Sequence, residues 1–145
     1  MELKEALPLL SQNNTAIAIT QNSRGIPQST VVTTGMVDGR LCWISRGRTI
    51  KVKNIERTGR ATVTVLKLEN RRYVTIEGPA VITHWPENPQ SATEIANHVD
   101  LLKKVYIAMG RTPTQSDEEF AQIMAEEMRI VVSVTPESIY GSLSH

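Results

Sequence analysis

The sequence contains little of what would mark a disulfide-bonded or nucleic-acid-binding protein. It has one cysteine, Cys42, which excludes an intrachain disulfide framework and fits a reducing cytosol. Aromatic residues make up only 4% of the chain, too few for the stacking platforms that hold single-stranded nucleic acid. The formal net charge is +1, whereas a general nucleic-acid binder usually has a strongly basic domain. We therefore expect no nucleic-acid partner.

Long apolar segments are missing as well. No apolar run approaches the roughly 20 residues that a membrane-spanning helix needs. The N-terminal stretch MELKEALPLLSQ carries acidic side chains early and only a short apolar run, unlike a secretory signal. We expect a cytoplasmic protein with no membrane span. Its 145 residues, 40% of them hydrophobic, suit one compact domain over residues 1–145.

The histidines and the single cysteine give no sign of a reactive or metal-binding cluster. His84, His98 and His145 lack metal-ligand spacing, so no metal site is predicted. His98 is expected on the polar side of a helix, in contact with solvent. Cys42 and Trp43 are consecutive in a predicted strand, so one of them should face the interior.

β-prone segments dominate what the chain does contain. The expected strands lie at 15–20, 28–37, 40–45, 60–68, 71–83 and 129–136. Asp38 and Gly39 predict a tight hairpin turn between two of them, and Gly78 followed by Pro79 predicts a bend in another. This order favours a small β-barrel or curled sheet of about six antiparallel strands, with three or four helices at one end.

Four segments have helical patterns. A short helix is expected at 2–11, although Pro8 is unfavourable inside a helix. Another is expected at 49–57, ended by Gly59. A longer helix should begin at a cap formed by Asn88 and Pro89 and end at Gly110. The last, at 116–128, opens with a capping-box pattern, S-D-E-E.

One stretch, from Ser45 to Val65, concentrates positive charge. Its first sixteen residues hold six cations, which are Arg46, Arg48, Lys51, Lys53, Arg57 and Arg60. A charge run is usually a solvated face. Here, however, the cations follow a strand directly and surround the start of a short helix, whose free N–H groups and partial positive charge suit a phosphate. The pattern favours a phosphate site.

Helical spacing sorts these side chains. Lys51 and Asn54 are three apart and share a face, so they are the predicted phosphate ligands. Lys53 and Arg57 share another face and are expected to meet acidic groups further out, or water. The side chains expected to reach in from the preceding loop are Arg46, Arg48 and Thr49.

A known superfamily has this order of segments. The sequence resembles the split β-barrel flavin and deazaflavin oxidoreductases, the superfamily of pyridoxamine 5′-phosphate oxidase, in TAIAIT, SRGIPQSTVVT, VDGRLCWISRGRTIKVKNIERTGRATVTV and RYVTIEGPAVI. The ending MRIVVSVTPESIYG is similar to the final strand and tail of the deazaflavin-dependent branch. The likeness covers nearly the whole chain except residues 84–115. Many relatives have an acidic residue and a proline where this chain has RTGR, a difference that affects the turn after the short helix.

The resemblance implies an FMN-binding split β-barrel that forms a homodimer, with two cofactor sites at the subunit interface. The cofactor phosphate would lie where the third strand ends and the lysine-bearing helix begins, and the ring would lie along the strand PQSTV. The implied cofactor-binding residues are Pro27, Gln28, Ser29 and Thr30 for the ring, and Ile44, Ser45, Arg46, Thr49, Lys51 and Asn54 around the phosphate.

Two cofactors carry a ribityl phosphate of this kind. One is FMN, and the other is coenzyme F-420, an 8-hydroxy-5-deazaflavin whose tail continues through lactate into glutamates. We favour F-420, because the C-terminal likeness is to that branch and because a longer acidic tail suits a wide cationic groove. The exposed cations that would line such a groove are Arg46, Arg48, Lys53 and Arg57. Haem or biliverdin is a further alternative.

The implied function is hydride transfer from the reduced deazaflavin to an unsaturated or quinone-like small molecule. Rival hypotheses are an FMN-dependent flavoprotein, a non-catalytic carrier of flavin, deazaflavin or haem, and a dimeric domain that binds an acidic protein. No catalytic residue is identified from the sequence. Tyr73, Tyr106 and Tyr140 are open as proton donors, although buried tyrosines are more often structural, and Trp85 is a candidate for a pocket wall.

Overall fold

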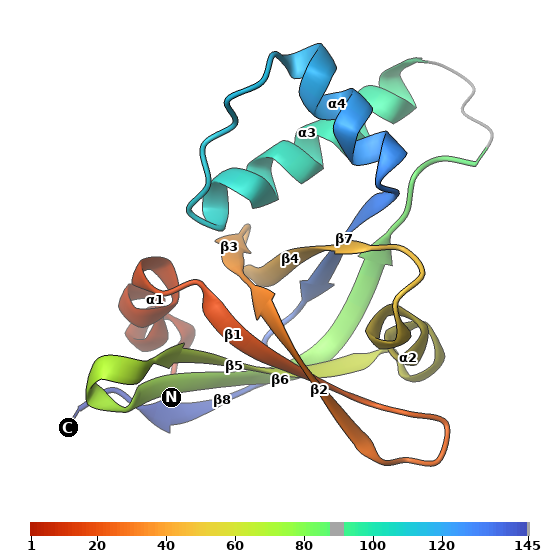
Figure 1. Cartoon of the computed structure of the whole chain (residues 1–145). Helices are drawn as coiled ribbons and strands as arrows, with labels where there is room; N and C mark the ends of the chain where they lie inside the picture. The colour runs from red at the N-terminus through yellow and green to blue at the C-terminus, as the bar shows by residue number, and fades with distance from the viewer. Residues whose placement is uncertain (88–91, 145) are drawn as a thin grey trace.

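The chain folds as a mainly antiparallel β structure with helices on two sides, seen here in a computed structural model that describes residues 1–87 and 92–144 (Figure 1). The described strands are β1 (Thr15–Gln21), β2 (Pro27–Thr33), β3 (Gly35–Val37), β4 (Arg40–Arg46), β5 (Arg60–Lys67), β6 (Arg72–Thr83), β7 (Arg129–Val134) and β8 (Ser138–Ser142). The described helices are α1 (Leu3–Gln12), α2 (Ile50–Thr58), α3 (Ala92–Ala108) and α4 (Asp117–Glu126), with a 3-10 turn at Leu68–Asn70. The expected fold class, a β-barrel-like sheet with peripheral helices, is confirmed.

The strands form one sheet in the order β2-β1-β5-β6-β7-β4-β3, and β8 pairs with β6. All of these pairings are antiparallel. β1 and β5 alternate buried and outward-facing residues along their length, as strands with one face in a core must. The sheet curls without closing, because β2 and β3 remain at its two ends.

The long strand β6 joins the two halves of the curled sheet. Its residues 72–79 pair with β5, and residues 80–83 pair with β7. Gly78 lies just before this change of partner, and a Cβ atom there would lie 1.9 Å from the backbone oxygen of Thr135. The expected bend at Gly78 and Pro79 is therefore the point at which the continuous strand β6 changes its pairing partner from β5 to β7. Glycine is needed there because the backbone at Thr135 passes against it.

Two apolar layers share β4 between them. Trp43 faces the barrel interior and is packed with residues from β5, β6 and α1. Cys42, the preceding residue, faces the opposite way into a second cluster formed with α3 and α4. As predicted, one of the two, Trp43, faces the barrel interior, and because both side chains are buried, β4 is covered on both faces.

The structure has eight described strands where the sequence predicted about six. The segment 28–37 is two strands, because the backbone N–H of Thr34 bonds to the carbonyl of Asn14 at 2.8 Å and the chain then leaves β1 to pair with β4. β8 was missed, since its sequence SIYGS is short, polar and only half-buried. Pro8 does not end α1, which continues to Gln12.

The turn and cap signals gave mixed outcomes. Asp38 and Gly39 both have positive φ in the turn between β3 and β4, and Gly59 ends α2 in the left-handed region, as predicted. The Ser116 side chain caps α4 by accepting from the N–H of Glu119. The predicted cap at Asn88 and Pro89 lies outside the described residues.

The close approach of the Thr135 backbone to Gly78 leads to a prediction about stability. Gly78→Ala should destabilise the protein by about 1–3 kcal/mol or more, because the new methyl group overlaps the Thr135 carbonyl and one strand must move. Gly47→Ala is the matched control, since a Cβ atom there meets nothing closer than 3.5 Å and should change stability by less than about 0.5 kcal/mol. Denaturant unfolding measures both, and equal losses would contradict the interpretation.

Candidate functional site

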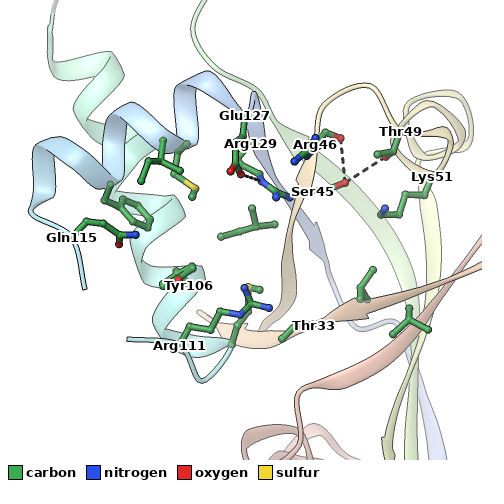
Figure 2. Close-up of a pocket in the computed structure, with 17 residues that line it drawn as sticks. Thr33, Ser45, Arg46, Thr49, Lys51, Tyr106, Arg111, Gln115, Glu127 and Arg129 are labelled. Carbon is green, nitrogen blue, oxygen red and sulfur yellow. Dashed lines mark hydrogen bonds and ion pairs between the residues drawn. The ribbon is translucent and has the colours of Figure 1, made fainter. Parts of the chain in front are cut away.

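A cavity of about 590 Å³ opens between the sheet and the helix pair α3–α4 (Figure 2). Its walls come from three places: the ends of β2 and β4, the start of α2 with the start of β7, and the inner faces of α3 and α4. The lining residues are Val31, Val32, Thr33, Ile44, Ser45, Arg46, Thr49, Lys51, Tyr106, Met109, Arg111, Gln115, Phe120, Ile123, Met124, Glu127 and Arg129. This size falls in the usual range for a small-molecule or cofactor site.

One side of the cavity is polar and lies where β4 gives way to α2. Ser45 is buried, and its hydroxyl oxygen lies 3.4 Å from that of Thr49 while donating to the Arg46 carbonyl at 3.2 Å. Lys51 extends from the first turn of α2 toward the same place (Figure 2). Of the predicted phosphate residues, the structure therefore brings together Ile44, Ser45, Arg46, Thr49 and Lys51 around one cavity.

The start of α2 has no side-chain cap. Thr49 occupies the N-cap position in an extended conformation, but no side-chain hydrogen bond from it reaches the helix N–H groups. The first turn also holds no acidic residue. The N–H groups at this end and the partial positive charge of the helix are thus left for another acceptor, which is the condition for binding an anion.

Positive charge is in excess around this cavity. Its lining contains four cations, Arg46, Lys51, Arg111 and Arg129, and one acid, Glu127. That acid is already engaged, because Arg129 Nε donates to it at 2.7 Å, and this hydrogen bond lowers the pKa of the Glu127 carboxyl. Burial, and then the charge of Arg129, lowers the pKa of Lys51. A bound anion would favour the charged form of the lysine and so oppose both effects.

The other side of the cavity is apolar and comes from the helix pair, of which α3 lies in the stretch 84–115 where the sequence showed no family likeness. Met109, Phe120 and Met124 are buried there, and the rings of Tyr106 and Phe120 meet edge to face at 5.4 Å. On α4, Phe120 and Met124 form a buried stripe four residues apart. Nothing in their spacing could have shown that this stripe also lines a cavity, because the stripe packs on β4 and β7 as well.

Asn54 lies outside this cavity. Its amide donates to Thr20 Oγ1 at 3.1 Å and to Gln28 Oε1 at 2.9 Å, and its own oxygen accepts from Arg57 Nη1 at 3.2 Å. Asn54 is buried, so these bonds fix α2 against β1 and β2. Although Lys51 and Asn54 lie near each other on the helix surface, one turns to the cavity and the other to the sheet.

Arg57 corrects a sequence expectation. It was assigned to acidic groups further out, or to water, but its guanidinium donates to the backbone carbonyl of Gln21 and to Asn54. Arg57 therefore links α2 to the end of β1 through a hydrogen bond. Lys53, its predicted companion, is exposed and does not line the cavity.

The predicted ring-binding residues Pro27, Gln28, Ser29 and Thr30 also lie outside the cavity. The lining residues of β2 are the next three, Val31 to Thr33. Pro27 pairs with Gln21 beside the hairpin turn, and Thr33 pairs with Thr15 at the other end of the strand. Since a strand rises about 3.3 Å per residue, these ends are roughly 20 Å apart, and the cavity is at the end nearer β4.

Arg129 is held from behind by two rings, the partly buried Trp85 and the buried His98. Its backbone carbonyl accepts from Trp85 Nε1 at 2.6 Å and lies 3.4 Å from His98 Nε2. The two rings contact each other with centroids 4.3 Å apart. His98 is 4% exposed, so the expectation of a solvated histidine is wrong: the helix turns this residue toward β7. Burial lowers the pKa of His98, and its Nδ1 has no partner within the described chain.

Of the other residues that the sequence singled out, some line the cavity and others lie outside it. Tyr106 lines it, whereas Tyr73 and Tyr140 lie on β6 and β8 and do not. Trp85 supports Arg129 rather than lining this cavity. The described residues contain no cluster of three or more His, Cys, Asp or Glu side chains placed to hold a metal ion. None of the described helices combines the length and apolar character needed to span a membrane.

Known proteins share this fold. No protein-family model matches the sequence, and no curated protein matches it significantly. The chain is similar to a conserved hypothetical protein from Mycobacterium tuberculosis, with a TM-score of 0.72 at 19% identity over 97% of this chain and 84% of that one. It is also similar to an F420 reductase, with a TM-score of 0.65 at 17% identity over 92% of this chain and 94% of that one.

A third similar structure is a pyridoxamine 5′-phosphate oxidase-related, FMN-binding protein from Nostoc punctiforme. Its TM-score is 0.64 at 11% identity, over 96% of this chain and 81% of that one. At these identities the likeness is one of fold. It confirms the split-barrel architecture that the sequence resemblance implied, and it leaves the cofactor to be argued from the residues of the cavity.

The position of Asn54 predicts a structural role. Asn54→Ala should lower the free energy of unfolding of the ligand-free protein by about 1–3 kcal/mol, because it leaves the buried Thr20 hydroxyl and the Gln28 carboxamide without this partner. Lys53→Ala, one position away and exposed, should change it by less than about 0.5 kcal/mol. An Asn54 variant as stable as the parent protein would show that the network contributes nothing.

The buried histidine predicts a pH dependence. Because the pKa of His98 is lower in the folded than in the unfolded chain, the unfolded chain takes up the proton first as the pH falls. Its contribution to stability is thus complete above the unfolded pKa of about 6.5 and declines below it. Thermal unfolding between pH 7.5 and 5.5 should show a smaller acid-induced loss in His98→Gln than in the parent protein. Parallel curves would rule out His98 as the cause.

Proposed function

We propose that the cavity binds the ribityl phosphate and ring of a flavin-type cofactor, with the deazaflavin coenzyme F-420 favoured over FMN, and that the protein is an oxidoreductase. The observation that carries the proposal is the excess of cations at an uncapped helix start, next to an apolar and aromatic wall. A phosphate at one end and a flat apolar ring at the other match these two halves of the cavity. The fold shared with an F420 reductase and an FMN-binding protein supports the same assignment.

The residues present suit a phosphate group. Lys51 supplies a charge-assisted hydrogen bond, and Ser45 and Thr49 supply hydroxyls next to the free N–H groups of α2. Arg129 supplies a second charge, and its position is fixed by Glu127 on one side and by Trp85 on the other. Val31 to Thr33 and Ile44 would contact the body of the cofactor from the sheet side.

The bound cofactor would supply hydride to an unsaturated or quinone-like acceptor. The chain's part is to bind, orient and exclude water. α3 and α4 cover one side of the cavity with Tyr106, Phe120 and Met124, so that this side is dry apart from polar groups at its rim. The exposed cations Arg46 and Arg48 near the phosphate end would suit the acidic tail of coenzyme F-420, which FMN lacks.

The proposal includes a homodimer. β2 is an edge strand, and Val31 on it is 73% exposed although it borders the cavity. Ile50, at the start of α2, is another large apolar side chain left in solvent. A second copy seated over these residues would bury both and close the cavity on its open side.

Cofactor titration tests the proposal. The purified protein should bind FMN or coenzyme F-420, and Lys51→Ala should weaken binding by about 1.5–3 kcal/mol, or roughly 10- to 150-fold in Kd, because a charged hydrogen bond to phosphate is lost. Lys53→Ala is the matched control, since it removes an exposed cation outside the cavity and should change Kd less than about twofold. Equal small losses in the two variants, or no binding of either cofactor, would refute the assignment.

A further inference from the structure

A second concentration of positive charge lies on the helical side of the cavity, away from Lys51. Arg111 lies three residues beyond the end of α3, after Gly110 with φ of +82°, and its backbone N–H donates to the carbonyl of Tyr106 at 3.2 Å. The guanidinium carbon lies 5.9 Å from the centroid of the Tyr106 ring. Figure 2 shows Arg111 entering from the helix pair and Lys51 from α2, on different sides of the cavity.

No carboxylate in the described part of the chain pairs with Arg111. The only acid lining the cavity, Glu127, is bonded to Arg129, and Asp117 at the start of α4 is bonded to Lys103. A cation just after a helix is favourable in itself, because it faces the negative end of the helix dipole. That effect explains the charge. Arg111 is exposed overall, but its guanidinium lies over the Tyr106 ring and borders the cavity. The placement in the cavity wall is what requires a further account.

We propose that Arg111 is a second anion subsite that binds the carboxylate of the substrate, a planar acid with an apolar body. This inference rests on the proposed function, in which the phosphate of the cofactor occupies the Lys51 end. The planar guanidinium presents paired N–H donors that match a carboxylate. Tyr106 and Phe120 supply the apolar surface beside it, and Gln115 adds a neutral hydrogen-bonding group to the same wall.

The carboxylates of an F-420 tail are another source of the same chemistry. They are less suited to this place, because the tail continues from the phosphate, and the phosphate end of the cavity is formed by Ser45, Thr49 and Lys51. Exposed cations outside the helix pair, including Arg46 and Arg48, are nearer in sequence to that end. Arg111 instead borders the side that the helix pair covers, where a second ligand would lie against the ring.

Binding of a matched pair of probes tests the proposal without relying on turnover. 2-Naphthoate and 2-naphthamide have nearly the same shape, but only the first carries a charge. Calorimetry on the FMN- or F-420-loaded protein should show that naphthoate binds about 10- to 150-fold more tightly than naphthamide, the range of a charged hydrogen bond. Arg111→Gln should remove this preference and leave naphthamide binding unchanged within about twofold.

Two further variants isolate the role of the guanidinium. Arg111→Lys should keep part of the preference, since it keeps the charge and loses the paired donors. Lys53→Gln should keep all of it, since that cation is exposed and outside the cavity. Thermal unfolding of Arg111→Gln should match the parent protein, which would show that the binding loss is local. A preference that survives in Arg111→Gln would overturn the proposal, as would the absence of naphthoate binding to the loaded protein.

The cofactor itself separates the remaining outcomes. If Arg111→Gln weakens F-420 but not FMN, the arginine binds the glutamate tail and the substrate subsite is wrong. If neither cofactor binds but the cofactor-free protein selects naphthoate through Arg111, the anion subsite stands and the proposed redox function fails. If both cofactors bind and naphthoate is not selected, the redox function stands and the subsite fails.

Discussion

The excess of positive charge around one cavity is the constraint on which the rest of this structure depends. Four cations and one already paired carboxylate line the same space, next to a helix end without a side-chain cap. Like charges gathered beside a low-dielectric wall repel one another, and burial lowers the pKa of Lys51 further. Such an arrangement is costly for stability alone, and it becomes favourable when an anion is bound.

The fold supplies this charge from positions that are rigid. The pairing of β4 with β7 places these residues side by side: Ser45 pairs with Ile130, and Arg46 pairs with Arg129. Behind Arg129, the indole of Trp85 holds its carbonyl, and β6 carries Trp85 there by continuing past Gly78. On the other side, Asn54 and Arg57 fix α2 to β1. The buried polar network thus serves the site by positioning the helix whose other face presents Lys51.

Much of this could be predicted from the sequence, and the failures have physical causes. The strands β1 and β5, the turn at Asp38, and the junction of strand and helix at Ser45 to Lys51 all depend on local patterns, and the structure has them as expected. Lys51 and Asn54 are three residues apart on α2, but Lys51 lines the cavity whereas Asn54 bonds to β1 and β2. Helical spacing alone does not predict this difference. His98 was misjudged because spacing alone does not say which side of α3 meets β7. Tyr106 lies within a predicted helix and Arg111 in the loop after it, neither belongs to a motif, and only tertiary packing brings them to the cavity.

The two sides of the cavity come from different parts of the chain. The end of β4 and the start of α2 offer charge and N–H groups that any ribityl phosphate could use, so under the proposed function that end would bind the part that FMN and coenzyme F-420 share. The wall from α3 and α4 contributes the buried apolar side chains, and Arg111 lies in the loop between the two helices. Of this wall, α3 and the loop up to residue 115 fall in the stretch that the family likeness does not cover, whereas α4 does not. Under the proposed function the two sides would have different tasks: the junction of β4 and α2 would hold the cofactor, and the wall from the helix pair would contact the second ligand. A substitution in that wall would then change the shape and charge offered to the substrate and leave the phosphate ligands of the cofactor in place.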